Sequence, residues 1–269
     1  CTCFDSPGNG IQNRSFRYAG WTFSRSICTG FRVCLGRDIA KLRWITKRPS
    51  WDRFTLPHTG DWSLAFDGKD NSVVVPALAW DGHEPMTLET VFVWSGGGTA
   101  FVAGQTGIDG FWLEIRDDML WVRKGREASL AVGASLAFAQ GKRVHAAAVW
   151  DGKEVRLYAN GVRVTGHYEA SWKEDPPDQG ADGFRIGLAG DHGFTGTIET
   201  VRVSKGARYT SDFTPEQALP LKPETNTLCL LDFENGEGET VADSSGNQHH
   251  GRIHGATWQA MWPCPISEA

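Results

Sequence analysis

Residues 144–164 read VHAAAVWDGKEVRLYANGVRV. Runs of strand-forming residues stand on either side of Asp151-Gly152 and again on either side of Asn160-Gly161. Asp-Gly and Asn-Gly between alternating runs are strong hairpin signals, because the turn residues must accept a positive φ. The stretch therefore predicts three antiparallel strands joined by tight turns.

The same pattern continues in both directions from this hairpin pair. Short runs rich in Val, Phe, Leu and Trp, each bounded by Gly, Asp or Asn, predict further strands at 63–67, 72–76, 87–94, 110–115, 119–123, 184–188, 196–203 and 228–233. A short helical turn is expected around Thr214–Leu219. Regularly spaced strands with turn chemistry between them favour an all-β, two-sheet antiparallel sandwich over a helical or α/β fold.

Composition narrows the possible functions. The chain has 269 residues, 40% of them hydrophobic and 22% charged, with a net charge of −5. This profile is typical of a globular protein. No apolar run approaches the length of about 18 residues that a membrane span requires, so none is expected. The mild acidity argues against nucleic acid as a partner, because phosphate binding requires a basic surface.

The first part of the chain differs from the rest. Residues 1–57 are basic and irregular, and Pro49, Pro57 and Gly60 mark the change. We therefore expect a basic N-terminal arm over 1–57 and the sandwich over 61–262. The chain starts at Cys1, which suggests a processed or excised piece. Its six cysteines permit disulfides but do not fit a zinc site. A secreted or cell-surface location is therefore expected.

Several of these segments carry a family likeness. Residues 66–75, 87–93, 145–161, 194–204 and 207–215 resemble, in that order, the strands of laminin G-like jelly rolls in the concanavalin A-like lectin/glucanase superfamily. The likeness covers about residues 61–258. In many members a segment similar to Asp232-Phe233-Glu234 precedes the opening strand, whereas here it comes last. Either it packs back onto the sandwich or it begins another domain; the short remainder of the chain favours packing back.

A second, shorter likeness lies in the basic arm. Residues 15–21, Cys28 and residues 30–35 resemble the last segment of the formylglycine-generating sulfatase-modifying domain, which has a C-type-lectin-like fold. The arm is therefore either a fragment of such a preceding domain or an unrelated basic segment.

The superfamily resemblance implies a possible calcium site where the first and closing strands lie side by side. By that resemblance Asp67 and Glu199 are the candidate ligands, with Asp232 and Asp243 as further candidates. A hard cation such as calcium needs several oxygen ligands. The alternative is that Asp67-Gly68 is simply a turn and Glu199 a surface residue of its strand.

Tryptophans supply the candidate ligand contacts. Trp80 and Trp172 fall in expected loops beside acidic residues, and Trp112 is adjacent to Phe111 and so points to the opposite face of its strand. Aromatic rings pack on sugar faces while polar groups fix the hydroxyls. Trp94 and Trp150 are expected to extend core faces instead.

A hydrolytic function is the weaker expectation. Glycosidases of this superfamily place two carboxylates on one strand face, as nucleophile and general acid. Glu89 stands alone on its strand, and Glu114 with Asp117 is the nearest approach to a pair. The sequence therefore predicts a non-catalytic recognition or adhesion module that binds a glycan or a surface protein. The alternatives are a glycoside hydrolase and a structural spacer.

Overall fold

The computed structural model describes the backbone at 15–18, 21–26 and 30–32, and then residues 56, 59–78, 80–107, 109–125, 132–135, 139–165 and 183–261. The chain divides into two compact units, 1–47 and 48–269. The first unit contains one antiparallel sheet in the order β1-β2-β3. Its strands are β1 (Ser15–Tyr18), β2 (Trp21–Ser26) and β3 (Gly30–Arg32). The four cysteines of the arm, Cys1, Cys3, Cys28 and Cys34, lie outside the described residues.

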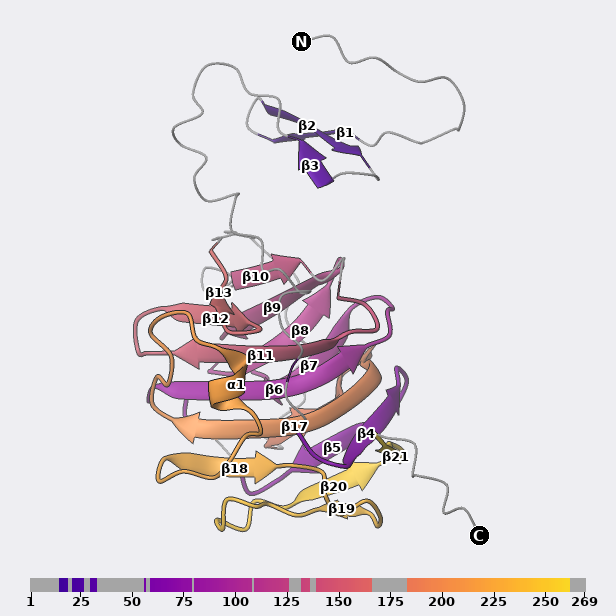
Figure 1. Ribbon diagram of the computed structural model, residues 1–269, viewed down its shortest axis with the longest axis vertical. Helices are drawn as coiled ribbons and strands as arrows, with labels where there is room; N and C mark the ends of the chain where they lie inside the picture. Colours follow the sequence, from indigo (N-terminus) through magenta and orange to yellow (C-terminus); the bar gives the residue numbers. More distant parts are fainter. Residues whose placement is uncertain are drawn as a thin grey trace. The chain divides into compact units, whose positions relative to one another are not determined.

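The second unit is a two-sheet antiparallel jelly-roll sandwich, as predicted (Figure 1). The first sheet has the order β13-β12-β11-β6-β17-β4-β21, and β18 also pairs with β17. Its strands are β4 (Trp62–Asp67), β6 (Met86–Trp94), β11 (Arg143–Trp150), β12 (Val155–Ala159), β13 (Val162–Arg163), β17 (Thr195–Lys205), β18 (Thr227–Leu231) and β21 (Thr257–Ala260).

The second sheet has the order β10-β9-β8-β7-β14-β5-β20-β19. Its strands are β5 (Ser72–Val75), β7 (Ala100–Gln105), β8 (Phe111–Arg116), β9 (Met119–Lys124), β10 (Val132–Ser135), β14 (Phe184–Ile186), β19 (Thr240–Val241) and β20 (Gly251–His254). A small hairpin, β15 (Leu188–Ala189) with β16 (His192–Gly193), forms a separate two-stranded sheet that packs against β7.

The core lies between the two sheets and follows the alternation of the strands. In β6, Leu88, Phe92 and Trp94 point into it, and the sequence predicts this for Trp94. The opposite face of β6 is buried as well, because Glu89 and Val91 have no exposed surface. The sequence pattern did not indicate this second layer of burial.

The second layer is the crossing segment, defined as residues 206–226 between β17 and β18. It carries α1 (Pro215–Ala218), the short helical turn expected from the sequence, which lies in front of β6 in Figure 1. Leu219 and Leu221 pack with Val91 in one apolar cluster, and Phe213 packs against Tyr158. The outer face of the first sheet is therefore covered by the chain itself. No helix in the described part of the chain is long and apolar enough to span a membrane.

The C-terminal segment packs back onto the sandwich, which confirms that expectation. β18 pairs with β17, β20 pairs with β5, and β21 pairs with β4. Met261 N donates to Asp61 O at 2.9 Å, so both ends of the sandwich meet at one sheet edge. Cys229 in β18 is a buried free thiol, and burial raises its pKa.

The Asn160-Gly161 turn anchors the start of the crossing segment. Asn160 and Gly161 have φ values of 47° and 77°, which is the conformation that the hairpin signal predicts. Gly161 O accepts a hydrogen bond from Phe213 N at 2.8 Å. A Cβ atom at Gly161 would lie 2.0 Å from Phe213 O, so the close approach requires glycine.

We expect Gly161→Ala to lower the free energy of unfolding by about 2 kcal/mol, because strain at positive φ is joined by a backbone clash. Chemical denaturation measures this loss. Gly141→Ala is the matched control, since Gly141 has φ 73° and no atom within 4 Å of its added Cβ. It should cost about 1 kcal/mol. Equal losses in the two variants would show that the contact with Phe213 contributes nothing.

Candidate functional site

The predicted calcium ligands Asp67 and Glu199 have different surroundings. Asp67 is the exposed last residue of β4, and its Oδ1 accepts a hydrogen bond from Lys69 N at 3.0 Å. Glu199 is buried, and its two oxygens accept bonds from Arg143 Nε and Nη2 at 2.8 and 2.6 Å. Thr59 Oγ1 also donates to Glu199 at 2.6 Å. A carboxylate in a bidentate pair with Arg143 does not fit a calcium site.

The two further candidates organise the turn after β18. Asp232 Oδ2 accepts a hydrogen bond from Ser244 Oγ at 2.5 Å. Asp243 accepts bonds from the backbone N–H groups of Leu230, Ser245 and His249, each at 2.9 Å. Burial opposes ionisation of Asp243, but these donors outweigh it and lower its pKa.

The four acids therefore have structural partners in place of a metal. Among the residues that the structure describes, no three His, Cys, Asp or Glu side chains form a group that could hold a metal ion. The residues present do not fit the calcium site that the resemblance implies.

Trp112 and Glu114 lie together on the outer face of the second sheet. Phe111 points into the core and Trp112 away from it, as alternation predicts, yet only 1% of Trp112 is exposed. Trp112 Nε1 donates to Glu114 Oε2 at 2.8 Å, and Arg123 Nη1 donates to Glu114 Oε1 at 3.1 Å. Arg123 also lies over the Trp112 ring, 5.2 Å from its centroid.

This arrangement does not favour the hydrolase alternative. Both oxygens of Glu114 are engaged by an indole and a guanidinium, whereas a glycosidase needs two carboxyl groups facing the same bond. The buried Trp112 ring is likewise engaged within the protein, and it offers almost no surface to a ligand. Trp172, the third predicted ligand contact, lies outside the described residues.

Trp80 has a more open setting at one end of the sandwich. We define the rim cluster as Trp80, Lys124 and Trp150 with the neighbouring acids Asp81 and Asp109. Lys124 Nζ lies 5.0 Å from the centroid of the Trp80 ring and 5.4 Å from that of Trp150. Lys124 ends β9 in the second sheet and Trp150 ends β11 in the first, so the cluster joins both sheets.

Hydrogen bonds fix the two indoles of the rim cluster. Trp80 Nε1 donates to Glu84 O at 3.0 Å, and Trp150 Nε1 donates to His83 O at 3.4 Å. Gln105 exchanges two bonds of 2.9 Å with the backbone of Trp80. Both tryptophans are partly exposed as residues, although they also pack against the edge of the core.

Lys124 is the polar centre of the rim cluster. Its ammonium can donate three hydrogen bonds, and among the described residues it makes one, a long contact of 3.5 Å to Asp109 O. Burial lowers its pKa, while the charges of Asp109 and Asp81 act in the opposite direction. The arrangement leaves donor capacity beside two aromatic surfaces and two exposed carboxylates.

A buried charge network lies on the outer face of the first sheet. Glu89 in β6 is fully buried opposite Arg202 in β17, and Arg202 Nη2 lies 2.7 Å from Glu89 Oε2. Tyr209 OH donates to Glu89 Oε1 at 2.7 Å. Arg208 Nε and His145 Nε2 approach the same carboxylate at 3.4 and 3.7 Å. The network ties the crossing segment to the sheet.

A family model of the concanavalin A-like lectin/glucanases superfamily matches residues 67–212. The chain belongs to this superfamily. The match runs from β4 into the crossing segment and includes every residue of the rim cluster. No curated protein matches the chain in sequence.

Solved structures share the fold at low identity. A candidate carbohydrate-binding protein from Bacteroides ovatus has a TM-score of 0.56 at 19% identity, over 76% of this chain. The chain spans 61% of that protein's length. Laminin α1 domains LG4-5 from mouse have a TM-score of 0.40 at 15% identity, over 57% of this chain and 45% of theirs. At 19% identity, the likeness to the Bacteroides ovatus protein shows the fold alone.

Proposed function

We propose that the protein is a non-catalytic recognition module that binds carbohydrate through the rim cluster. The observation that carries this proposal is the placement of Lys124 between two half-buried indoles, with carboxylates beside it. Superfamily membership and the Bacteroides ovatus relative agree with this class of function.

The chemistry of the cluster suits a sugar. The C–H faces of a sugar ring pack on aromatic carbon, and its hydroxyl groups need both donors and acceptors. Lys124 supplies donors, while the exposed carboxylates of Asp81 and Asp109 supply acceptors. The fixed indoles reduce the entropy lost on binding, because their N–H groups are already held by the loop backbone.

A module of this kind would act on the outside of a cell or in the extracellular space. A glycan-binding rim and the laminin G-like fold support that placement. The contacts proposed for the sugar are made by the side chains of the rim cluster alone.

The test is a glycan array followed by calorimetry with the best ligand. We expect Lys124→Gln to weaken binding at least about tenfold, because a hydrogen bond from a charged donor is worth about 1.5 kcal/mol or more. Lys69→Gln is the matched control, since Lys69 is 80% exposed and pairs with Asp67 away from the cluster. It should leave the affinity unchanged.

Two further outcomes decide the proposal. A chelator should not alter binding, because no metal is part of the site. The proposal fails if no glycan binds, or if Lys124→Gln binds as tightly as the unmodified protein. Binding of an extracellular protein in place of any glycan would favour the adhesion alternative.

A further inference from the structure

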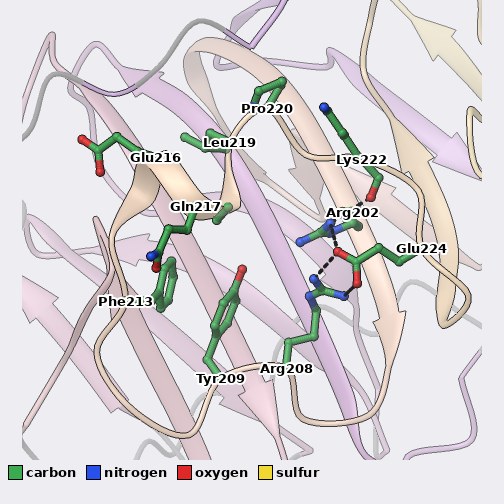
Figure 2. A pocket seen from close by; sticks show the side chains of 11 residues that line it. Arg202, Arg208, Tyr209, Phe213, Glu216, Gln217, Leu219, Pro220, Lys222 and Glu224 are labelled. Carbon is green, nitrogen blue, oxygen red and sulfur yellow. Dashed lines mark hydrogen bonds and ion pairs between the residues drawn. The ribbon is translucent and has the colours of Figure 1, made fainter.

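A cavity of about 370 Å³ lies against the outer face of the first sheet, within the crossing segment. None of the residues that line this cavity belongs to the rim cluster. Figure 2 shows an aromatic wall of Tyr209 and Phe213 facing a charged wall of Arg202, Arg208 and Glu224, with Leu219 and Pro220 at one end. A cavity of this size is in the range of small-molecule sites.

The aromatic wall is held in place from below. The rings of Tyr209 and Phe213 are stacked at 3.9 Å with an interplanar angle of 13°. Tyr209 OH donates to the buried Glu89, and Phe213 also packs edge-on against His145 at 5.8 Å. The wall is therefore a rigid aromatic surface on which a flat or compact ring can pack.

The charged wall has an inner and an outer part. Arg202 is 1% exposed and pairs with Glu89, which also lies 3.4 Å from Arg208. On the outer side, Glu224 makes a bidentate pair with Arg208, at 2.6 and 3.0 Å, and its side chain is half exposed. Ion pairs at such exposed positions contribute little to stability.

The charges at this wall balance only while Glu224 stays in place. Two guanidinium groups face two carboxylates, of which Glu89 is buried and Glu224 is accessible. Glu216 and Lys222 also line the cavity, and their opposite charges cancel formally. Without Glu224 the wall keeps one positive charge on Arg208, positioned for a bidentate bond to another carboxylate.

We propose that this cavity is a second binding site, for a small ring-shaped ligand whose single carboxylate replaces Glu224 on Arg208. The ring packs against Tyr209 and Phe213, and the carboxylate restores the charge balance. Two sources share this chemistry, a uronic acid sugar and an aromatic acid. The proposal does not depend on the rim cluster.

The experiment titrates three probes, glucuronate, benzoate and neutral glucose, into the full chain and follows binding by calorimetry or NMR. Glu224→Gln removes the competing charge, so we expect it to bind a carboxylate probe about fivefold tighter than the unmodified protein. The affinity for glucose should be the same in Glu224→Gln and in the unmodified protein, because glucose carries no carboxylate. A larger gain in affinity for glucuronate would identify the ligand as a uronic acid sugar, and a larger gain for benzoate would identify it as an aromatic acid.

Gln217→Trp is the blocking variant. Gln217 is exposed on α1 and lines the cavity without taking part in the ion pairs, so a tryptophan there should fill the space. Added to Glu224→Gln, it should abolish binding while the thermal midpoint stays within a few degrees. Lys69→Gln should leave the carboxylate binding unchanged, because Lys69 does not line this cavity. The proposal is overturned if Glu224→Gln gives no gain, if glucose gains equally, or if Gln217→Trp has no effect.

Discussion

Glu89→Gln is expected to lower the free energy of unfolding by about 4 kcal/mol, measured by urea denaturation at pH 7. The substitution keeps the shape of the side chain and removes its charge. Arg202 then stays fully buried with its remaining carboxylate partner, Glu224, at 3.5 Å. Breaking a buried ion pair by removing one partner costs about 3–5 kcal/mol, because the other charge is left uncompensated.

Glu224→Gln is the matched control for this prediction. It makes the same chemical change in the same network, but at a side chain that is 50% exposed, so its cost should not exceed about 1 kcal/mol. Similar losses in the two variants would contradict the assignment of Glu89 as the centre of the network. Small losses in both variants would show that the crossing segment is held mainly by its apolar contacts.

The role of Glu89 follows from its position between the sheet and the crossing segment. It receives contacts from β17, through Arg202, and from the crossing segment, through Arg208 and Tyr209. The apolar contacts of Leu219 and Leu221 with Val91 add to the attachment. The rigid aromatic wall of the proposed second site therefore depends on a carboxylate that no ligand would touch.

Sequence patterns predict most strands of the sandwich because tight turns leave local signals. Asp117 and Asp118 have φ values of 52° and 57°, and the hairpin at Asn160-Gly161 has the geometry that its sequence implies. β7 was missed for a physical reason. Its residues are buried on both faces up to Gln105, so hydrophobic and polar residues do not alternate along it. It also contains an irregularity between Phe101 and Ala103.

The sites are less predictable because their parts come from distant segments. Trp80 could be selected as a loop aromatic beside an acid, but Lys124 and Trp150 end strands of different sheets. Nothing local distinguishes them from ordinary strand ends. Glu89 likewise stands alone on its strand in the sequence, and its partners Arg202 and Tyr209 follow more than a hundred residues later. Only the fold reveals that the charges meet.

The sandwich should lose stability in acid as Glu89 takes up a proton. Burial would raise the pKa of Glu89, but His145, Arg202 and Tyr209 outweigh it and lower that pKa to about 2, from an ordinary value of 4.5. A carboxylate with a lowered pKa in the folded state stabilises the protein above pH 4.5. This stabilisation is lost as the pH falls from 4.5 toward 2.

The size of this effect follows from the same values. Since a pKa unit corresponds to about 1.36 kcal/mol, the difference between 4.5 and about 2 corresponds to about 3 kcal/mol. The measurement is the free energy of unfolding of the unmodified protein and of Glu89→Gln between pH 7 and pH 2. Because the glutamine resembles the protonated acid, the gap between them should shrink from about 4 to about 1 kcal/mol. The difference in the free energy of unfolding between the unmodified protein and Glu224→Gln should stay below about 1 kcal/mol from pH 7 to pH 2. If the difference between the unmodified protein and Glu89→Gln stays constant down to pH 2, protonation of Glu89 is not the cause of the loss of stability in acid.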